Sequence, residues 1–314
     1  IARKGKPHVF YSEFTSADGL VLAPAEGQKA LRRKLLFSPE ELPIVAQLFS
    51  AIPERMEKAA AIVAEMGFDG IDINMGCPDR AIEKGRCGAA MMRDPSLARE
   101  IIRAAKRGWE GQTFQTSGRS DLQGLPISVK TRIGYARNEL DTWLPLLLSE
   151  GIAAIAIHAR TRNEMSDVPA QWEAIAQTVA IRDALQPRGD ASRSTRTLII
   201  GNGDVRDISD AREKSAQTGC DGIMLGRAIY GNPWLFSELH TPVNTPIGEF
   251  TGAEERSHGK KIKALIEHLR LFDELLGDMV NYATMKKHFK AYVSGWPDAK
   301  ALRMRLMETE CVED

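Results

Sequence analysis

Cysteine is scarce in this 314-residue chain, and the four that occur (Cys77, Cys87, Cys220 and Cys311) lie far apart, with no CxxC pair among them. Their spacing argues against a zinc site and against a disulfide framework, and it suits the reducing cytoplasm. No apolar run approaches the ~20 residues that span a bilayer. No apolar stretch follows the basic start of the chain either, so we expect no signal peptide. Together with the cysteine spacing and the lack of a bilayer-length apolar run, this leads us to expect no metal and no membrane contact.

An excess of charge of either sign is also absent, since 42 lysines and arginines balance 42 aspartates and glutamates. A neutral chain has no overall attraction for nucleic acid or membrane, so a polyanionic partner would have to meet a local basic patch. The apolar content of 43% and the charged content of 27% are ordinary for a globular protein. No large apolar stripe is left over on the predicted surface, and we therefore expect a monomer.

Short apolar segments alternate along the chain with amphipathic helical ones. The helix after Pro53 shows the pattern clearly, with apolar residues at helical spacing from Met56 to Met66 and Gly67 at its end. Further helices are expected over 95–106, 141–150, 172–184 and 208–218. Strands are expected at 9–14, 44–49, 70–74, 127–131, 154–158, 198–201 and 222–225. Repeated strand–helix units of this kind predict a parallel sheet with crossover helices.

Seven strands are predicted, whereas a closed (β/α)8 barrel has eight. The first of them begins close to residue 1, so we interpret the chain as an α/β TIM barrel whose first βα unit is missing from this sequence. The alternative is a doubly wound open sheet, but no GxGxxG motif follows a strand, and the nearest glycine cluster, Gly201–Asp204, does not match it. Two polar segments, Gly111–Gly124 and Pro187–Arg196, are interpreted as tolerated surface loops.

The pattern changes beyond a linker rich in Pro, Thr and Gly at Thr241–Gly252. Helices are expected there over 254–276, 281–293 and 297–309, so we predict a barrel domain over residues 1–240 and an all-α helical domain over 253–314. Basic residues are frequent along these helices. They are Lys260, Lys261, Lys263, Arg270, Lys286, Lys287, Lys290, Lys300, Arg303 and Arg305. They form either a solvated surface or a face that contacts nucleic-acid phosphates, and composition alone does not decide.

A thiol follows the strand at 70–74, within the segment Asp72–Pro78. The carboxyl ends of strands are where barrels keep their chemistry. Cys77 is there either a small buried apolar residue or a proton donor or nucleophile. Because Pro78 stops the strand and Asn74 offers both an amide donor and an acceptor, the segment presents polar groups. We therefore favour a chemical role for Cys77.

Other polar side chains lie at or beside the ends of successive strands. Gln47, Lys130 and His158 bring an amide, an ammonium and an imidazole, which suit a flat, heteroatom-rich ring such as flavin. The last two strands end in Gly201–Asp204 and Gly226-Arg227, whose glycine N–H groups and guanidinium suit a phosphate. Each residue alone also has a structural interpretation, such as a turn glycine or a salt-bridged lysine. Their common position favours a flavin and phosphate site.

These residues resemble those of the tRNA-dihydrouridine synthase family. The resemblance covers residues 9–236 in the family's order, and the Asn-Met-Gly-Cys-Pro string is its most specific part. The matching segments are Glu13–Asp18, Val45–Leu48, Asp72–Pro78, Val129–Gly134, Ile157–Arg162, Gly201–Asp204, Gly226–Ala228 and Gly231–Trp234. The helical tail, including Met285–Phe289, resembles the family's RNA-binding domain more loosely.

The resemblance implies an FMN-dependent oxidoreductase in which NADPH or NADH reduces the flavin. FMN would lie across the mouth of the barrel, with an amide, an ammonium and an imidazole on its ring and ribityl side and the glycine-rich segments on its phosphate. The implied cofactor-binding residues are Gln47, Lys130, His158, Asn202, Gly203, Asp204, Gly226 and Arg227. The barrel domain is then the catalytic domain.

The resemblance also implies tRNA as the partner. A target uridine would be flipped out of the RNA, hydride would pass to uracil C6, and Cys77 would protonate C5 from the opposite face. Asn74 would bind the uracil edge, and Arg160 or Arg162 would help to hold the RNA. Basic residues of the helical domain would grip phosphates. The implied tRNA-binding lysines are Lys286, Lys287 and Lys290.

One departure from the family pattern is the absence of its first strand, which carries an Ala-Pro-Met type segment that touches FMN. Two other functions stay open. The first is a flavin-dependent barrel enzyme that reduces a free enone or pyrimidine, although a small substrate has no need of a basic tail. The second is a non-catalytic RNA-binding protein, which would be colourless. The sequence does not indicate which tRNA position is modified.

Overall fold

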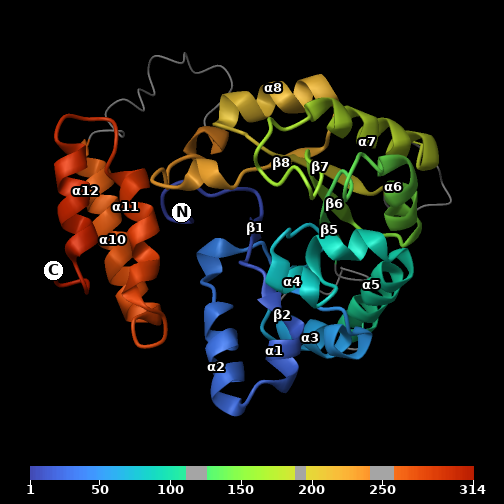
Figure 1. The fold of residues 1–314 in the computed structure, drawn as a ribbon, viewed down its shortest axis with the longest axis horizontal. Coiled ribbons are helices and arrows are strands. Elements are labelled where there is room, and N and C mark those ends of the chain that lie inside the picture. The colour runs from blue at the N-terminus through green and yellow to red at the C-terminus, as the bar shows by residue number, and fades with distance from the viewer. Residues whose placement is uncertain (111–125, 188–195, 241–257) are drawn as a thin grey trace. The chain divides into compact units, whose positions relative to one another are not determined.

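The computed structural model of the chain describes residues 1–110, 126–187, 196–240 and 258–314 (Figure 1). The chain divides into two compact units, one formed by His8–Leu225 and the other by Ile1–Pro7 together with Gly226–Asp314. The predicted surface loops, apart from Pro187 and Arg196, lie outside the described residues, as does the predicted linker. Within the described ranges, no helix is long and apolar enough to span a bilayer.

The larger unit is built on one parallel sheet with the order β1-β3-β4-β5-β6-β7-β8, and β2 also pairs with β3. Its strands are β1 (Phe10–Tyr11), β2 (Thr15–Ser16), β3 (Ile44–Phe49), β4 (Gly70–Asn74), β5 (Ile127–Arg132), β6 (Ala154–His158), β7 (Leu198–Asn202) and β8 (Gly222–Met224). Buried, largely apolar runs such as those of β3 and β4 are typical of parallel strands that are covered on both faces.

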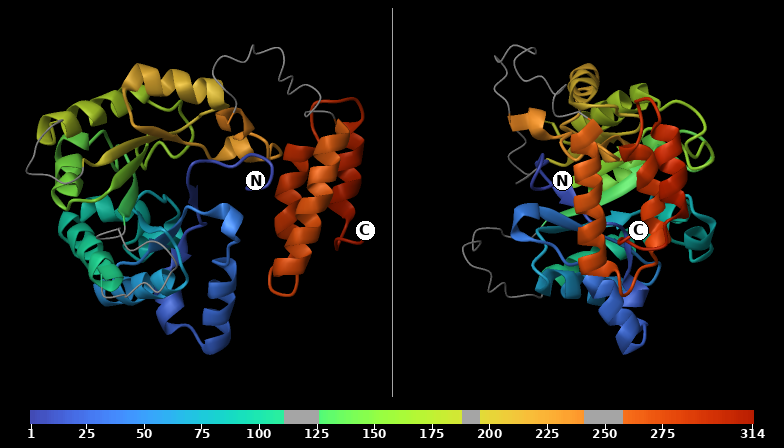
Figure 2. Two further views of the ribbon diagram at one scale, coloured as in Figure 1. Left: turned by 180° about the vertical axis from the view of Figure 1, so that it is seen from behind. Right: turned by 90° about the vertical axis from the view of Figure 1, so that its left-hand side faces the viewer.

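Helices surround this sheet, which curls into a half-barrel (Figures 1 and 2). They are α1 (Ala17–Leu22), α2 (Ala25–Lys34), α3 (Pro53–Glu65), α4 (Arg80–Lys84), α5 (Pro95–Glu110), α6 (Leu140–Ser149), α7 (Trp172–Leu185) and α8 (Ile208–Thr218), with 3-10 helices η1 (Pro39–Glu41) and η2 (Gly88–Arg93). This arrangement resembles a TIM barrel, which confirms the predicted α/β class. Helix α2 was not predicted because most of its ten residues are polar and none of them is buried.

The predicted strand at 9–14 is wrong in its extent, because the segment forms two two-residue strands, β1 and β2, both beside β3. Ser12 lies between them. Its N–H donates to Val45 O (2.9 Å), and its hydroxyl accepts from the N–H of Gln47 (3.0 Å). Since the Ser12 hydroxyl takes the position that a backbone carbonyl would fill, the chain leaves the ladder after Tyr11. The other six strands end within one residue of their predicted bounds.

The outer helices pack closely enough to require glycine at one crossing. Helix α5 buries a face of apolar residues at helical spacing, including Ile101, Ala105 and Trp109. At Gly108 an added Cβ would lie 1.9 Å from the carbonyl oxygen of Glu57 in α3. No side chain fits there, so the approach of α3 and α5 depends on glycine. Each large apolar side chain buried in this core contributes about 1.5–3 kcal/mol.

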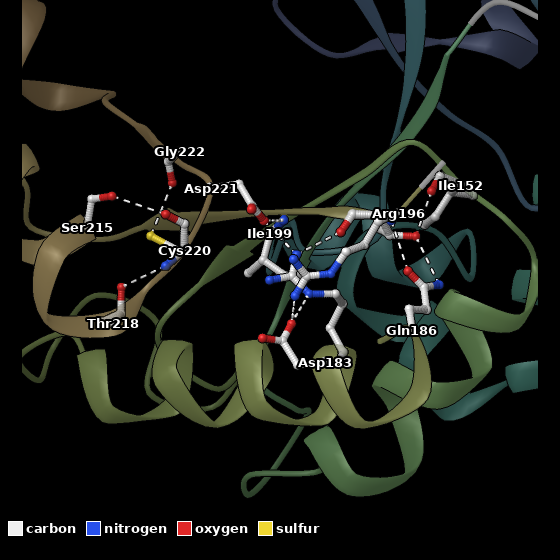
Figure 3. Close-up of polar contacts among 12 residues, drawn as sticks. Ile152, Asp183, Gln186, Arg196, Ile199, Ser215, Thr218, Cys220, Asp221 and Gly222 are labelled. Carbon is white, nitrogen blue, oxygen red and sulfur yellow. Dashed lines mark hydrogen bonds and ion pairs between the residues drawn. The ribbon is translucent and has the colours of Figure 1, made fainter. Parts of the chain in front are cut away.

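The amino-terminal edge of the sheet carries a buried polar network (Figure 3). Arg182 of α7 is fully buried and donates to Thr197 O (2.9 Å) and to Asp221 Oδ2 (2.6 Å). Asp221 also accepts from the N–H of Ile199 in β7 (2.8 Å), and the N–H of Thr197 donates to Gln186 Oε1 (2.9 Å). These bonds tie α7 to the starts of β7 and β8. At this edge of a barrel, such contacts serve stability.

The smaller unit is helical. Its elements are η3 (Arg227–Ile229), η4 (Ser237–His240), α10 (His258–Leu276), η5 (Tyr282–Met285), α11 (Lys286–Tyr292) and α12 (Ala299–Glu308). The start of the helix predicted at 254–276 lies outside the described residues. The helix predicted at 281–293 is divided into η5 and α11, and Asn281 caps η5 by accepting from the N–H of Ala283 (2.8 Å). Leu265, Phe272 and Phe289 lie in its apolar core.

Candidate functional site

Polar side chains gather where the central strands of the larger unit end. The register places Gln47 of β3 beside Asp72 of β4, and Asp72 beside Ser128 of β5. Two residues further along, Asn74 lies beside Lys130. Side chains two residues apart in a strand share a face, so Asp72 and Asn74 point to the same side of the sheet. Three predicted site residues, Gln47, Asn74 and Lys130, therefore occupy one carboxyl edge.

A chain of hydrogen bonds links these strands. Gln47 Nε2 donates to Asp72 Oδ2 (2.7 Å), and Asn74 Nδ2 donates to Gln47 Oε1 (3.1 Å). Ser128 Oγ donates to the other carboxylate oxygen, Asp72 Oδ1 (2.6 Å). All four residues are buried, so water does not compete for these bonds. The amides of Gln47 and Asn74 are thereby held in one orientation.

Asp72 and Lys130 form the charged centre of this edge. Burial raises the pKa of Asp72 to about 6, while hydrogen bonds from Ser128 and Gln47 and the charge of Lys130 act to lower it. Burial also lowers the pKa of Lys130 to about 8, and Asp72 opposes that shift. Both groups therefore titrate much closer to neutral pH than usual. Such shifts are typical of functional sites.

His158 ends β6 and lies beside Asn202 of β7. Its Nε2 is 2.9 Å from Arg160 Nη1. Because a guanidinium can only donate, Nε2 accepts and the ring proton lies on Nδ1. The pKa of His158 is lowered to about 3, mainly by burial and also by the nearby cations, Lys130 first among them. His158 is therefore a neutral imidazole with one N–H to offer.

Arg160 is almost completely buried, with 2% of its surface exposed. Its Nε donates to Val168 O (2.6 Å), and its Nη2 forms an ion pair with Asp204. The carboxylate of Asp204 also accepts from the N–H of Ala170 (3.0 Å). Every guanidinium nitrogen thus has a partner within the protein. RNA binding by Arg160 stays a prediction, whereas its contacts favour support of His158.

Cys77 lies in the loop between β4 and α4. The Asn74 side chain holds this loop, because its Oδ1 accepts from the N–H groups of Gly76 (3.2 Å) and Cys77 (3.0 Å). The thiol is partly exposed, and burial is the main cause that raises its pKa; a backbone hydrogen bond from Asp79 acts in the opposite direction. The thiol is therefore protonated at neutral pH. Such a group suits an acid better than a thiolate nucleophile.

Gly88 of η2 supports the same loop from the other side. Its φ is +61°, and an added Cβ would lie 2.6 Å from Cys77 O and 3.2 Å from Cys77 Cβ. The next residue, Ala89, donates its N–H to Cys77 O (2.9 Å). A side chain at position 88 would push the thiol loop away, so this contact requires glycine. Sequence analysis did not select Gly88, because only the folded chain brings it to Cys77.

Two arginines brace the thiol loop. Arg132 is buried and donates through Nε to Gly76 O (2.8 Å) and through Nη1 to Thr161 O (2.9 Å). Arg162 Nε donates to both carboxylate oxygens of Glu83 in α4 (2.9 Å each). The loop is thereby tied to the segment that follows β6. The predicted contact of Arg162 with RNA stays a prediction.

The predicted phosphate-binding residues fall in two different units. Asn202 and Gly203 belong to the larger unit, where Asn202 Nδ2 donates to Met224 O (2.8 Å) and Gly203 has a φ of +129° that favours glycine. Gly226 and Arg227 begin the second part of the smaller unit. A shared role of these four residues in binding a phosphate stays a prediction.

The three lysines predicted to contact tRNA lie in α11. Lys286 Nζ donates to Met307 O (2.8 Å), so its ammonium is already engaged near the end of α12. Lys287 and Lys290 are exposed, and no ion pair of either lies within the described ranges. Residues 258–314 carry ten basic and nine acidic side chains. Any attraction of this region for RNA must therefore be local.

Sequence reasoning missed Asp72 as a site residue. A signal was present, since a carboxylate between Ile71 and Ile73 is out of place in an apolar strand. Its partners come from two neighbouring strands, so only the register identifies them. As for metals, the described part of the chain contains no group of three or more His, Cys, Asp or Glu side chains that could hold an ion.

Comparison with known proteins decides the family. The dihydrouridine synthase (Dus) family model matches residues 1–314. The chain belongs to the dihydrouridine synthase family. A probable tRNA-dihydrouridine synthase of Staphylococcus aureus (strain COL) is 34% identical over 318 residues, covering 100% of this chain and 85% of the relative. A probable tRNA-dihydrouridine synthase 2 of Bacillus subtilis (strain 168) is also 34% identical, with 86% of it covered. The resemblance drawn from the motifs is confirmed.

Solved structures show weaker similarity to this member of the dihydrouridine synthase family. A DHODH of Eimeria tenella in complex with ferulenol matches with a TM-score of 0.43 and 10% identity, over 68% of this chain and 56% of that one. A flavocytochrome b2 variant with sulfite bound matches with a TM-score of 0.38 and 18% identity, over 96% and 74%. Similarity at this level carries no conclusion about function or cofactor.

Proposed function

We propose that this protein is an FMN-dependent tRNA-dihydrouridine synthase that reduces specific uridines to 5,6-dihydrouridine with NAD(P)H as the reductant. The observation that carries the proposal is the partly exposed, protonated thiol of Cys77 in a loop that the carboxyl edge of the sheet holds in place. Family membership supports the same activity. We further propose that the enzyme works in the cytoplasm as a monomer.

The donors at the carboxyl edge fit a flavin. The ammonium of Lys130 favours negative charge on a reduced ring, and the neutral His158 offers its Nδ1–H. Gln47 has a second Nε2 hydrogen free for a ring heteroatom, since Asp72 takes only one. When bound, FMN would take hydride from NAD(P)H and supply it to uracil C6. The proposed phosphate side comprises Asn202, Gly203, Gly226 and Arg227, with Asp204 acting through Arg160.

Cys77 supplies the proton in this proposal. Hydride addition at C6 of uracil forms an enolate, and C5 must then be protonated. The thiol donates its proton to C5, and the resulting thiolate takes a proton from water. Asn74 has one Nδ2 hydrogen left for a uracil carbonyl, because its other N–H and its Oδ1 are bound within the protein.

A uridine inside folded tRNA has to leave its stack to reach the thiol. Exposed cations would hold the RNA during this step by contacting phosphates, which gives affinity without reading sequence. Lys287 and Lys290 of α11 are the exposed candidates, and Arg162 lies beside the thiol loop through Glu83. Selection of one uridine would then depend on how the whole tRNA is oriented.

Mass spectrometry of unmodified tRNA incubated with the protein, FMN and NADPH tests the proposal. We expect a gain of two hydrogens on a uridine. Cys77→Ala should reduce product formation about 100-fold or more, as expected for loss of a general acid, while flavin binding and NADPH oxidation persist. Cys311→Ala changes an exposed cysteine and serves as the matched control, with full activity expected.

The alternatives give different results in the same assay. Dihydrouridine formed at the normal rate by Cys77→Ala would exclude the thiol as the acid. Reduction of free uridine or UMP, without reduction of tRNA, would favour a small-molecule reductase. A colourless protein that binds tRNA and leaves it unchanged would favour a non-catalytic RNA-binding role.

A further inference from the structure

The carboxyl edge contains a carboxylate that no step of the proposed reaction uses. Asp72 is fully buried, with 0% of its surface exposed, between Ile71 and Ile73 of β4. We propose that Asp72 is a positioning residue that fixes the amide of Gln47 and, through Asn74, the backbone of the thiol loop. Its link to catalysis rests on the proposed function, whereas its effect on the loop can be tested independently.

The direction of each hydrogen bond follows from the carboxylate. An ionised carboxylate only accepts, so Gln47 must turn its Nε2 toward Asp72 (2.7 Å). That orientation turns Gln47 Oε1 toward Asn74, whose Nδ2 donates a hydrogen bond to it (3.1 Å). Asn74 Oδ1 is then left to accept from the N–H groups of Gly76 (3.2 Å) and Cys77 (3.0 Å). We call Asp72, Gln47 and Asn74 the amide relay.

Ser128 and Lys130 keep Asp72, the first residue of the amide relay, ionised, so that it can only accept hydrogen bonds. Ser128 Oγ donates to Asp72 Oδ1 (2.6 Å), so that oxygen has no need of a proton. Lys130 lies on the neighbouring strand, and its charge favours the ionised form of Asp72. The relay therefore begins at a group that has no proton to donate, and its direction cannot reverse while Asp72 stays ionised.

Asp72→Asn is expected to reverse the relay without changing its size. The new amide keeps its oxygen on Ser128 and turns its NH2 group toward Gln47. The Gln47 amide must then flip, and the Asn74 amide must flip in turn. Asn74 would present an NH2 group to the N–H groups of Gly76 and Cys77, which lose their acceptor. The damage would thus appear in the thiol loop, at Gly76 and Cys77, four and five residues from the substitution.

A second substitution should restore the loop. In the double variant Asp72→Asn/Asn74→Asp, a carboxylate at position 74 accepts from the flipped Gln47 and from both backbone N–H groups. Every donor then has an acceptor again, and the negative charge stays beside Lys130, which is the register partner of position 74. A role for Asp72 in packing alone predicts no such restoration.

Hydrogen exchange at the amides of Gly76 and Cys77, measured on the whole protein without substrate, tests the relay. We expect exchange about tenfold faster in Asp72→Asn, and a return to within about threefold of wild type in the double variant. Asp69→Asn is the matched control, because Asp69 Oδ2 accepts from the N–H of Ile44 (2.7 Å) at the other end of β4. Unchanged exchange in Asp72→Asn, or no recovery in the double variant, overturns the proposal.

A second variant keeps the proposal testable. If Asp72→Asn does not fold, Gln47→Leu interrupts the relay at its middle, and faster exchange at the same two amides is again expected. Unchanged exchange in Gln47→Leu then overturns the relay.

Activity separates the relay from the proposed function. With tRNA, FMN and NADPH, dihydrouridine formation should fall about tenfold in Asp72→Asn. Only the exchange should recover in the double variant, because a carboxylate at position 74 has no N–H for uracil. If the wild-type protein makes no dihydrouridine but the variants show the predicted exchange pattern, the proposed function is rejected and the relay is supported. Normal activity with unchanged exchange in Asp72→Asn rejects the relay alone.

Discussion

The two edges of one sheet hold buried polar groups of opposite kinds. At the amino edge, Arg182 meets two carboxylates, and although burial acts to raise the pKa of Asp221, hydrogen bonds from Ile199 and Arg182 lower it. At the carboxyl edge, burial dominates instead. It moves the pKa of Lys130 to about 8 and that of His158 to about 3. Paired charges keep Asp221 ionised at the amino edge, whereas burial shifts Lys130 and His158 away from their charged forms at the carboxyl edge.

This difference distinguishes a structural network from a functional one. At the amino edge, the charge of Arg182 is compensated within the protein by Asp183 and Asp221, without a ligand. At the carboxyl edge, burial disfavours the charged forms of Lys130 and His158, and a negatively charged or polar ligand would offset that penalty. Shifted pKa values of this kind are typical of binding and catalytic groups. Position at the carboxyl ends of the strands and pKa values shifted by burial therefore indicate the same edge as the functional one.

Arg182→Met should break the amino edge with the largest effect on stability. It removes a fully buried guanidinium from Thr197 O and from Asp221. Removing one member of a buried ion pair costs about 3–5 kcal/mol. Urea unfolding followed by circular dichroism measures this loss. Arg55→Met is the matched control, because its ion pair with Asp18 is exposed, and a loss below about 1 kcal/mol is expected.

The activity of Arg182→Met tests whether the amino edge has only a structural role. At a temperature where Arg182→Met is folded, dihydrouridine formation per folded molecule should equal that of wild type. A large loss of activity without unfolding would show that the amino edge takes part in the chemistry. That result would contradict the division between the two edges.

Much of the sheet could be predicted, because its signals are local. Apolar runs bounded by Gly, Asn and Pro place six strands within one residue of their observed bounds. The break between β1 and β2 could not be predicted, since the Ser12 hydroxyl acts there on the backbone of Gln47, 35 residues away. The short helix α4 and the mostly polar helix α2, which buries no residue, were not predicted either.

The candidate site could be located from the sequence but its contacts could not. Position at or near the end of a strand is enough to bring Gln47, Lys130 and His158 to one edge. The burial of Arg160 against Asp204, and the direction that Asp72 imposes on its neighbours, depend on the register of several strands. A single sequence carries no record of register. For this reason the supporting residues were missed while the polar strand ends were found.

His158→Gln tests the carboxyl edge through its pH dependence. The pKa of His158 is about 3 in the folded protein against an ordinary 6.5, so the unfolded chain binds a proton more readily between these values. The stability that His158 contributes is therefore full above pH 6.5 and falls by about 2 kcal/mol between pH 7 and pH 5. Asp72, with its pKa raised to about 6, acts in the opposite direction over this range.

Comparison of variants isolates the histidine from Asp72. The loss of unfolding free energy between pH 7 and pH 5 should be about 2 kcal/mol smaller in His158→Gln than in wild type. Arg55→Met should keep the wild-type slope, since it leaves both the carboxyl edge and the Arg182 network intact. Equal slopes in wild type and His158→Gln would mean that the folded protein binds a proton at His158 as readily as the unfolded chain does.

The smaller unit should show the smallest effects, because its charges are exposed. Lys287→Glu/Lys290→Glu reverses two cations of α11 and should weaken tRNA binding about tenfold at low salt, with a shallower dependence of Kd on salt. The unfolding free energy should change by less than about 0.5 kcal/mol. Lys260→Glu/Lys263→Glu makes the same change on α10 and is the matched control. Weakening of tRNA binding by Lys287→Glu/Lys290→Glu alone would show that α11 contacts the RNA. Equal weakening by both double variants would show instead that tRNA binding depends on the overall charge of the helical region.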